Sequence, residues 1–118
     1  MGTLDDVRRI ASTLPGAYEH ASHGGAPSFR TKPRGFAFHR EDLDALAVCV
    51  ASEEDKHALI AAEPSVFTTP HYDGYSIVLV RLDEAPADEL EELLIEAWRL
   101  RAPKKDVARW DEEHPLAN

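Results

Sequence analysis

The sequence is poor in cysteine and has no long apolar segment. Its 118 residues include one cysteine, Cys49, so no intramolecular disulfide can form and nothing indicates an oxidising compartment. No apolar run approaches the roughly 20 residues that a membrane-spanning helix needs. The N-terminal stretch, MGTLDDVRRIASTLPG, is polar and amphipathic, unlike a secretory signal. We therefore expect a cytoplasmic protein with no membrane partner.

Recognisable catalytic and cofactor-binding motifs are also missing. The chain has no phosphate-binding loop, no dinucleotide-binding glycine pattern and no G-x-S-x-G nucleophile. Cys49 lies in an apolar stretch, which is typical of a small core residue rather than a reactive thiol. His20 and His23 form a single H-x-x-H pair without the further ligands that zinc requires. We expect a non-enzymatic protein without cofactor or metal, with an enzyme or a histidine metal site as the less favoured alternatives.

Charge is distributed unevenly along the chain. The 22 acidic and 13 basic residues give a net charge of −9, which argues against a protein that is basic overall. Two stretches nevertheless concentrate positive charge, and the first, between Glu19 and Glu41, contains no acidic residue. The cations are Arg30, Lys32, Arg34 and Arg40 in the first stretch, and Arg99, Arg101, Lys104, Lys105 and Arg109 in the second. The chain is therefore polarised in a way that its average charge hides.

Three helices are predicted from capping residues and apolar spacing. Thr3 caps a first helix that ends at Pro15-Gly16, and Ser52 caps a second that ends at Pro64. Pro86 is suited to the first position of a third helix, because its missing N–H does no harm there.

The strands predicted between these helices contain alternating or β-branched residues. They are Tyr18 to Ala21, Ser28 to Thr31, Phe36 to Arg40, Ala45 to Ala51, Val66 to Thr68 and Tyr75 to Leu82. Phe36 and Phe38 are expected on one face of their strand. In the next strand the small side chains of Ala45 and Ala47 share a face, and we expect a helix to approach the sheet closely there.

The order helix, three or four strands, helix, one or two strands, helix predicts an α+β fold. It has two layers, an antiparallel sheet with helices on one face. The length suits a single domain, which we place at residues 1–105. Residues 106–118 are expected to form a C-terminal tail. After Pro103 we expect a short helical turn followed by frayed chain.

Five blocks of the sequence resemble the MmcQ/YjbR family of small bacterial proteins. They are LPGAYE at 14–19, GAPSFR at 25–30, GFAF at 35–38, FTTPHYDGY at 67–75 and WRLRAPKK at 98–105. The resemblance implies an α+β two-layer fold, and DNA binding by two β-hairpin wings. By match, the first wing is Arg30 to Arg40, and the second is Thr69 to Tyr75. The second departs from what DNA binding requires, because it has no Lys or Arg and contains Asp73.

Two functions follow as hypotheses. The first is weak DNA binding through the first hairpin, and its candidate residues are Arg30, Lys32, Arg34 and Arg40, with Lys104 and Lys105. The alternative is a protein-interaction module of unknown partner with no nucleic-acid role, which uses an exposed sheet edge or the acidic helical surface. Merging of the basic residues into one patch would favour DNA; neutralisation of the hairpin by Glu41, Asp42 and Asp44 would count against it. An open sheet face with aromatic and basic side chains would suit single strands.

Overall fold

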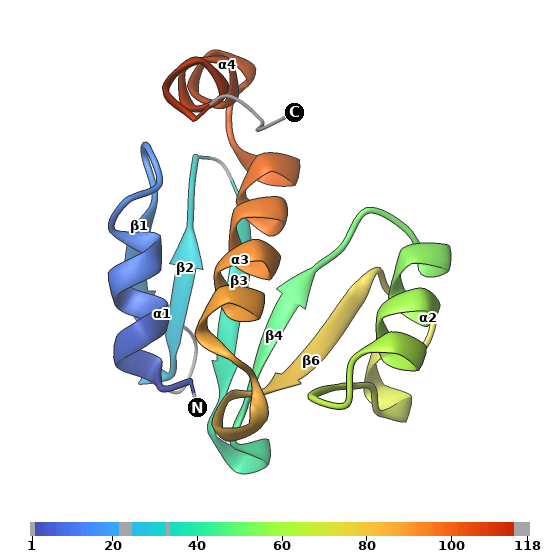
Figure 1. Ribbon diagram of the computed structural model, residues 1–118. Helices are drawn as coiled ribbons and strands as arrows, with labels where there is room; N and C mark the ends of the chain where they lie inside the picture. The colour runs from blue at the N-terminus through green and yellow to red at the C-terminus, as the bar shows by residue number, and fades with distance from the viewer. Residues whose placement is uncertain (1, 22–24, 33, 115–118) are drawn as a thin grey trace.

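The computed structural model describes residues 2–21, 25–32 and 34–114 of the chain (Figure 1). Its helices are α1 (Leu4–Ala11), α2 (Glu53–Ala62), α3 (Ala87–Arg101) and α4 (Lys104–Glu113). Its strands are β1 (Tyr18–Ala21), β2 (Pro27–Arg30), β3 (Gly35–Arg40), β4 (Ala45–Cys49), β5 (Val66–Phe67) and β6 (Ile77–Arg81). Short 3₁₀ turns are η2 (Glu41–Leu43), η3 (Pro70–Tyr72) and η4 (Leu82–Glu84). In the described part of the chain, no helix combines the length and apolar character needed to cross a membrane.

The strands form one six-stranded sheet in the order β1-β2-β3-β4-β6-β5, and every neighbouring pair is antiparallel. Figure 1 shows α1, α2 and α3 in front of this sheet, with α4 above the end of α3. The α+β class and the antiparallel sheet predicted from the sequence are therefore confirmed. The sequence pattern succeeded because strand alternation and helix capping are local signals.

The main core lies between the sheet and α1 and α3. Leu46 and Val48 of β4 point into it and are fully buried, as are Leu90 and Trp98 of α3. The Trp98 indole Nε1 donates a hydrogen bond to the carbonyl of Pro15 at 3.1 Å, which satisfies the one polar group of this buried ring.

A smaller apolar cluster covers the opposite face of the sheet. It contains Ala45, Ala47, Leu79 and Tyr72, all buried. The expectation that a helix approaches the small side chains of β4 is therefore wrong. The turn η3 lies there instead, because the space above two alanines accommodates the ring of Tyr72.

A bulge in the β2–β3 pair changes which aromatic residues face the core. The register shifts between Phe29 and Arg30, and Phe36 and Ala37 both pack into the main core. Phe38 then points to the opposite face, where it packs against the smaller cluster. The expectation that Phe36 and Phe38 share a face is wrong, because the extra residue of a bulge shifts the alternation by one position.

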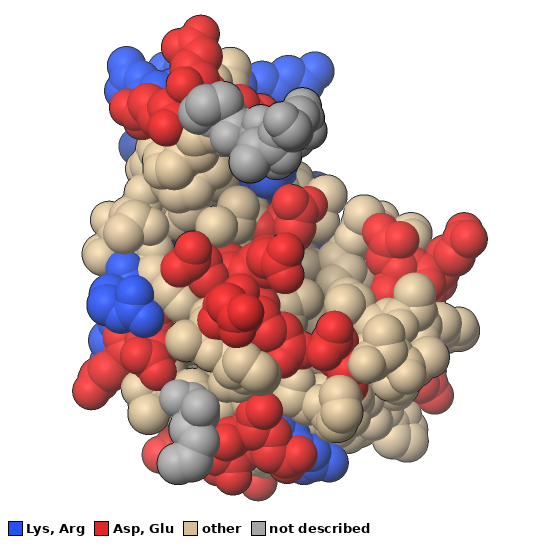
Figure 2. Space-filling view, viewed as in Figure 1, with Lys and Arg blue, Asp and Glu red and all other residues tan. Residues whose placement is uncertain are grey.

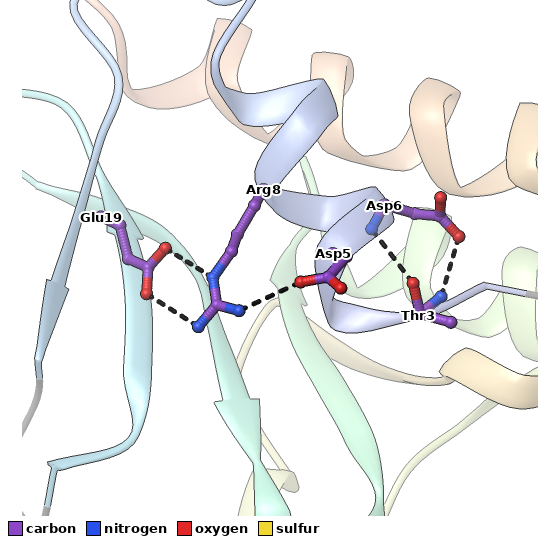
Figure 3. A network of polar contacts seen from close by, with 5 residues as sticks. All are labelled: Thr3, Asp5, Asp6, Arg8 and Glu19. Atoms are coloured by element: carbon purple, nitrogen blue, oxygen red, sulfur yellow. Dashed lines mark hydrogen bonds and ion pairs between the residues drawn. The ribbon is translucent and has the colours of Figure 1, made fainter.

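The N-terminal helix is capped and attached to the sheet by polar contacts (Figure 3). The Thr3 hydroxyl accepts from the Asp6 N–H at 3.2 Å, and an Asp6 carboxylate oxygen accepts from the Thr3 N–H at 3.0 Å, a complete capping box. Arg8 donates to Asp5 and makes a bidentate pair with Glu19 of β1, with Nε–Oε1 at 2.9 Å. This bidentate ion pair connects the edge strand β1 to α1.

The helix ends differ in three places from the sequence prediction. The first helix ends at Ala11, before Pro15-Gly16, and Pro86 is the N-cap of α3 rather than its first residue. Residues 104–113 form a ten-residue helix, α4, where a helical turn and frayed chain were expected. Val107 and Trp110 of α4 pack against the main core, which explains why this segment is ordered.

Candidate nucleic-acid interface

The β2–β3 hairpin projects two cations at its tip. The Thr31 N–H donates to the Arg34 carbonyl at 2.8 Å and closes the loop, while the Thr31 side chain is fully buried beneath it. Lys32 and Arg34 are exposed. The loop backbone is thus anchored, and both cationic side chains remain available to solvent.

Arg30 lies at the end of β2, next to this tip. Its cross-strand neighbour on β1 is Tyr18, which is 46% exposed. A Cβ placed on Gly35 would lie 3.7 Å from Cγ of Arg30, so the arginine stem crosses the glycine. The half-buried stem of Arg30 is held by its neighbours, on the sheet face opposite Phe29.

Arg40 is separated from the tip by the whole of β3, a distance of roughly 16–20 Å for six residues. Its guanidinium donates to Asp42 at 2.8 and 3.1 Å and to the Tyr72 hydroxyl. These contacts raise the pKa of Arg40 and lower the pKa of Asp42. The structure does not bring Arg40 together with Lys32 and Arg34, and the charge of Arg40 is already compensated.

Lys104 and Lys105 begin α4 and are exposed. Figure 1 places α4 and the β2–β3 loop at the same end of the molecule. Contacts between the end of α3 and β3 agree with this placement. Nη2 of Arg101 lies 3.5 Å from Sγ of Cys49, which in turn lies 4.0 Å from the carbonyl oxygen of Gly35.

Ion pairing divides the cations of the chain into two groups. Of the 13 lysines and arginines, Arg8, Arg9, Arg40, Arg81 and Arg99 form ion pairs with carboxylates, and Lys56 is buried. The remaining cations, here called the basic end, are Arg30, Lys32, Arg34, Arg101, Lys104, Lys105 and Arg109. Within the described residues, none of them forms an ion pair. The basic end therefore concentrates the uncompensated positive charge of an acidic protein.

Acidic residues near the basic end are engaged elsewhere or lie on α4. Glu19, the last acid before the first hairpin, is paired with Arg8. Glu41 and Asp44 have no ion pair in the described part of the chain and lie near Arg40, away from the tip. The helix α4 itself is mixed, since it also carries Asp106, Asp111, Glu112 and Glu113. Figure 2 accordingly shows both colours at the α4 end, and mainly red over α3 and α2.

The second predicted wing, Thr69 to Tyr75, folds back onto the protein. Its turn η3 is held by Lys56 of α2, which is 2% exposed and whose Nζ donates to the carbonyls of Tyr72 at 2.7 Å and Tyr75 at 2.9 Å. The sequence patterns above do not single out this lysine. Lys56 lies three residues before Leu59 and four before Ile60, on the apolar side of α2. A lysine on the apolar side of a helix is the sequence feature that indicates its burial.

No metal centre is formed by the residues that the structure describes, in which no group of three or more histidine, cysteine or carboxylate side chains is arranged to hold an ion. His20 lies exposed on β1, and His23 is outside the described residues. His39, His71 and Tyr72 instead line a shallow hollow beside Arg40 on the face of the sheet that the helices leave open.

Comparisons with known proteins agree on one family. The YjbR family model matches residues 12–100. Two uncharacterized proteins, Mb2600 of Mycobacterium bovis and Rv2570 of Mycobacterium tuberculosis, are each 42% identical over 121 residues, which cover 91% of this chain and 94% of each relative. The crystal structure of the Deinococcus radiodurans protein DR2400, with a DUF419 domain, has a TM-score of 0.69 at 28% identity, covering 85% of this chain and 78% of that one. The chain belongs to the YjbR family.

Proposed function

We propose that this protein binds DNA weakly through the basic end, with the β2–β3 hairpin as its main contact. The proposal rests on the observation that some cations of the chain form ion pairs with carboxylates and others do not. Cations that lie elsewhere on the surface are compensated by carboxylates, whereas those of the basic end have no such partner among the described residues. A surface of uncompensated cations attracts the phosphate backbone of a nucleic acid.

The placement of Lys104 and Lys105 supports this reading. Both lie in the first turn of α4, where the positive end of the helix dipole disfavours cations. Their position therefore does not stabilise the helix, in contrast to Arg99 and Arg101 in the last turn of α3. A bound phosphate backbone would supply the missing negative charge.

Tyr18 adds a feature that matters for the choice between single and double strands. Its ring is exposed beside Arg30 on the edge strand β1. Aromatic rings next to cations stack on unpaired bases, and each stacked base contributes roughly 1–3 kcal/mol. Single-stranded DNA is therefore included beside the duplex in the test below.

The test is fluorescence anisotropy of labelled 20-nucleotide single- and double-stranded DNA across a salt series. If Arg30, Lys32, Arg34, Lys104 and Lys105 each neutralise one phosphate, the slope of log K against log salt is about −4.5 for duplex and about −3.5 for single strands. The double variant Lys32→Glu/Arg34→Glu should weaken binding at 50 mM salt by at least tenfold and reduce the duplex slope by about 1.8.

The matched control is Arg9→Glu/Arg81→Glu, which changes the net charge equally at two cations that are paired in the native protein. Neither residue belongs to the basic end, and loss of such surface pairs costs at most about 1 kcal/mol each. We expect less than a threefold change in affinity. Equal weakening by both double variants, or no binding by the wild-type protein at 20 mM salt, would refute the proposal.

A further inference from the structure

A groove of about 580 Å³ separates α2 from α3, on the face of the molecule seen in Figures 1 and 2. Its apolar lining includes Leu59 of α2 and Leu93 and Leu100 of α3. Leu100 is 45% exposed, although it is a large apolar side chain. Apolar surface is thus open to solvent between two helices, and burial of such surface favours binding.

The sides of the groove are acidic. Five carboxylate residues line it, and no lysine, arginine or histidine does: they are Asp55, Glu63, Glu89, Glu92 and Glu96. Only Glu96 of these has a cation within 4.0 Å, Nε of Arg99, in the part of the chain that the structure describes. Figure 2 shows acidic side chains over both helices. The groove therefore combines an apolar floor with uncompensated negative walls.

Ionisation of one of these carboxylates, Glu89, is disfavoured by its surroundings. Burial and the neighbouring Glu63 raise the pKa of Glu89, although the Ser65 hydroxyl, which donates to both Glu89 oxygens at 3.1 and 3.2 Å, opposes the shift. Ser65 is itself buried. Repulsion between two carboxylates that have no nearby cation is relieved when a positive group enters between them.

We propose that the α2–α3 groove binds a basic amphipathic helix of a partner protein, with leucine-type side chains on the floor and lysine or arginine along both acidic walls. Recognition of an amphipathic helix in an apolar groove uses this combination of surfaces, and complementary charge fixes the orientation. The ten residues of α2 extend over about 15 Å, so the groove accommodates about three turns of the bound helix.

A second copy of the chain fits the groove less well than a partner protein. The basic segment with helical structure is α4, but its apolar residues Val107 and Trp110 already pack on its own core. Its outer surface is mixed in charge, with Asp111, Glu112 and Glu113 near its end. The groove is also distinct from the basic end, since its carboxylates repel phosphate.

The test uses a fluorescein-labelled 14-residue peptide of leucine and lysine, patterned so that the leucines share one helical face. Its affinity is measured by fluorescence anisotropy at 100 mM salt, with wild-type protein and with Glu92→Lys/Glu96→Lys. We expect saturable binding to the wild type and at least tenfold weaker binding to the variant. Amide shift mapping with the wild type should place the largest changes on α2 and α3.

The matched control is Glu112→Lys/Glu113→Lys, which alters the net charge equally on α4, outside the groove. It should change the affinity less than twofold. Four results would overturn the proposal: no binding by the wild type, equal weakening by both variants, equal affinity for a peptide with serine in place of leucine, or competition of the peptide with concentration-dependent dimerisation. The last result would assign the groove to a second copy.

Discussion

Replacement of Lys56 by methionine tests whether a buried ammonium group holds the loop after β5. The wild-type Nζ donates to the carbonyls of Tyr72 and Tyr75 at 2.7 and 2.9 Å, and the residue is 2% exposed. Methionine keeps the apolar stem and most of the volume, so Lys56→Met removes the two hydrogen bonds without opening a large cavity.

The expected cost follows from two opposing contributions. Hydrogen bonds that involve a charged group contribute about 1.5–3 kcal/mol each when one partner is removed. Methionine carries no charge, so the variant no longer pays the desolvation cost of a buried ammonium, which offsets several kcal/mol of the loss from the two hydrogen bonds. The Tyr72 carbonyl also keeps a second donor, the Tyr75 N–H at 3.1 Å, so within the described residues only the Tyr75 carbonyl is left without a donor. We therefore expect the free energy of unfolding to fall by about 2 kcal/mol.

The assay is urea denaturation followed by circular dichroism, with Lys32→Met as the control. Lys32 is exposed in the hairpin loop, and its replacement should change the free energy of unfolding by less than about 0.5 kcal/mol. Hydrogen exchange at the Tyr72 and Tyr75 amides should also accelerate in Lys56→Met, because the loop is released locally. A variant as stable as the wild type, with unchanged exchange, would refute the assignment of Lys56 as the anchor of this loop.

Three further changes probe the core and the charges. Leu79→Ala, in the fully buried cluster beneath the ring of Tyr72, should cost about 2–5 kcal/mol in denaturation, and a loss below about 1 kcal/mol would contradict its placement. The Arg40 guanidinium lowers the pKa of Asp42 from 3.8, so ionised Asp42 stabilises the fold above its unfolded-state pKa. This contribution is lost as the pH falls through the pKa of Asp42 in the folded protein. In Arg40→Gln, the pKa of Asp42 measured by NMR titration should return to the ordinary range. The pKa of Glu89 is raised from 4.5, so ionisation of this carboxyl destabilises the fold as the pH rises above 4.5. In thermal unfolding, Glu89→Gln should therefore be more stable than the wild type at pH 7 and equally stable at pH 3. Equal stability at both pH values would contradict the raised pKa of Glu89.

Local structure was largely predictable from the sequence. The caps at Thr3 and Ser52 are found as expected, and the predicted strand Tyr18 to Ala21 coincides with β1. Such signals depend on residues within one turn or one strand of each other, so no knowledge of distant segments is needed. The α+β class follows from the order of these elements alone.

The bulge after Phe29 and the helical state of residues 104–113 were not predictable in the same way. A bulge depends on how two strands match in register, and α4 is stabilised by the contact of Trp110 with Trp98, at 5.7 Å between ring centroids. Both depend on contacts between two different elements rather than on the pattern within one of them.

Most helices and strands, their order and the unequal distribution of charge along the chain follow from the amino-acid sequence. Which cations remain uncompensated also depends on the fold, because the pairs Arg8–Glu19 and Arg99–Asp111 join residues from different elements. Arg40 is one of four arginines and lysines in the acid-free stretch, yet Asp42 compensates its charge, and the Tyr72 hydroxyl, 32 positions away, also accepts a hydrogen bond from it. Lys32 and Arg34 stay open to solvent. The same reason applies to the α2–α3 groove, whose walls come from helices that only the fold places side by side.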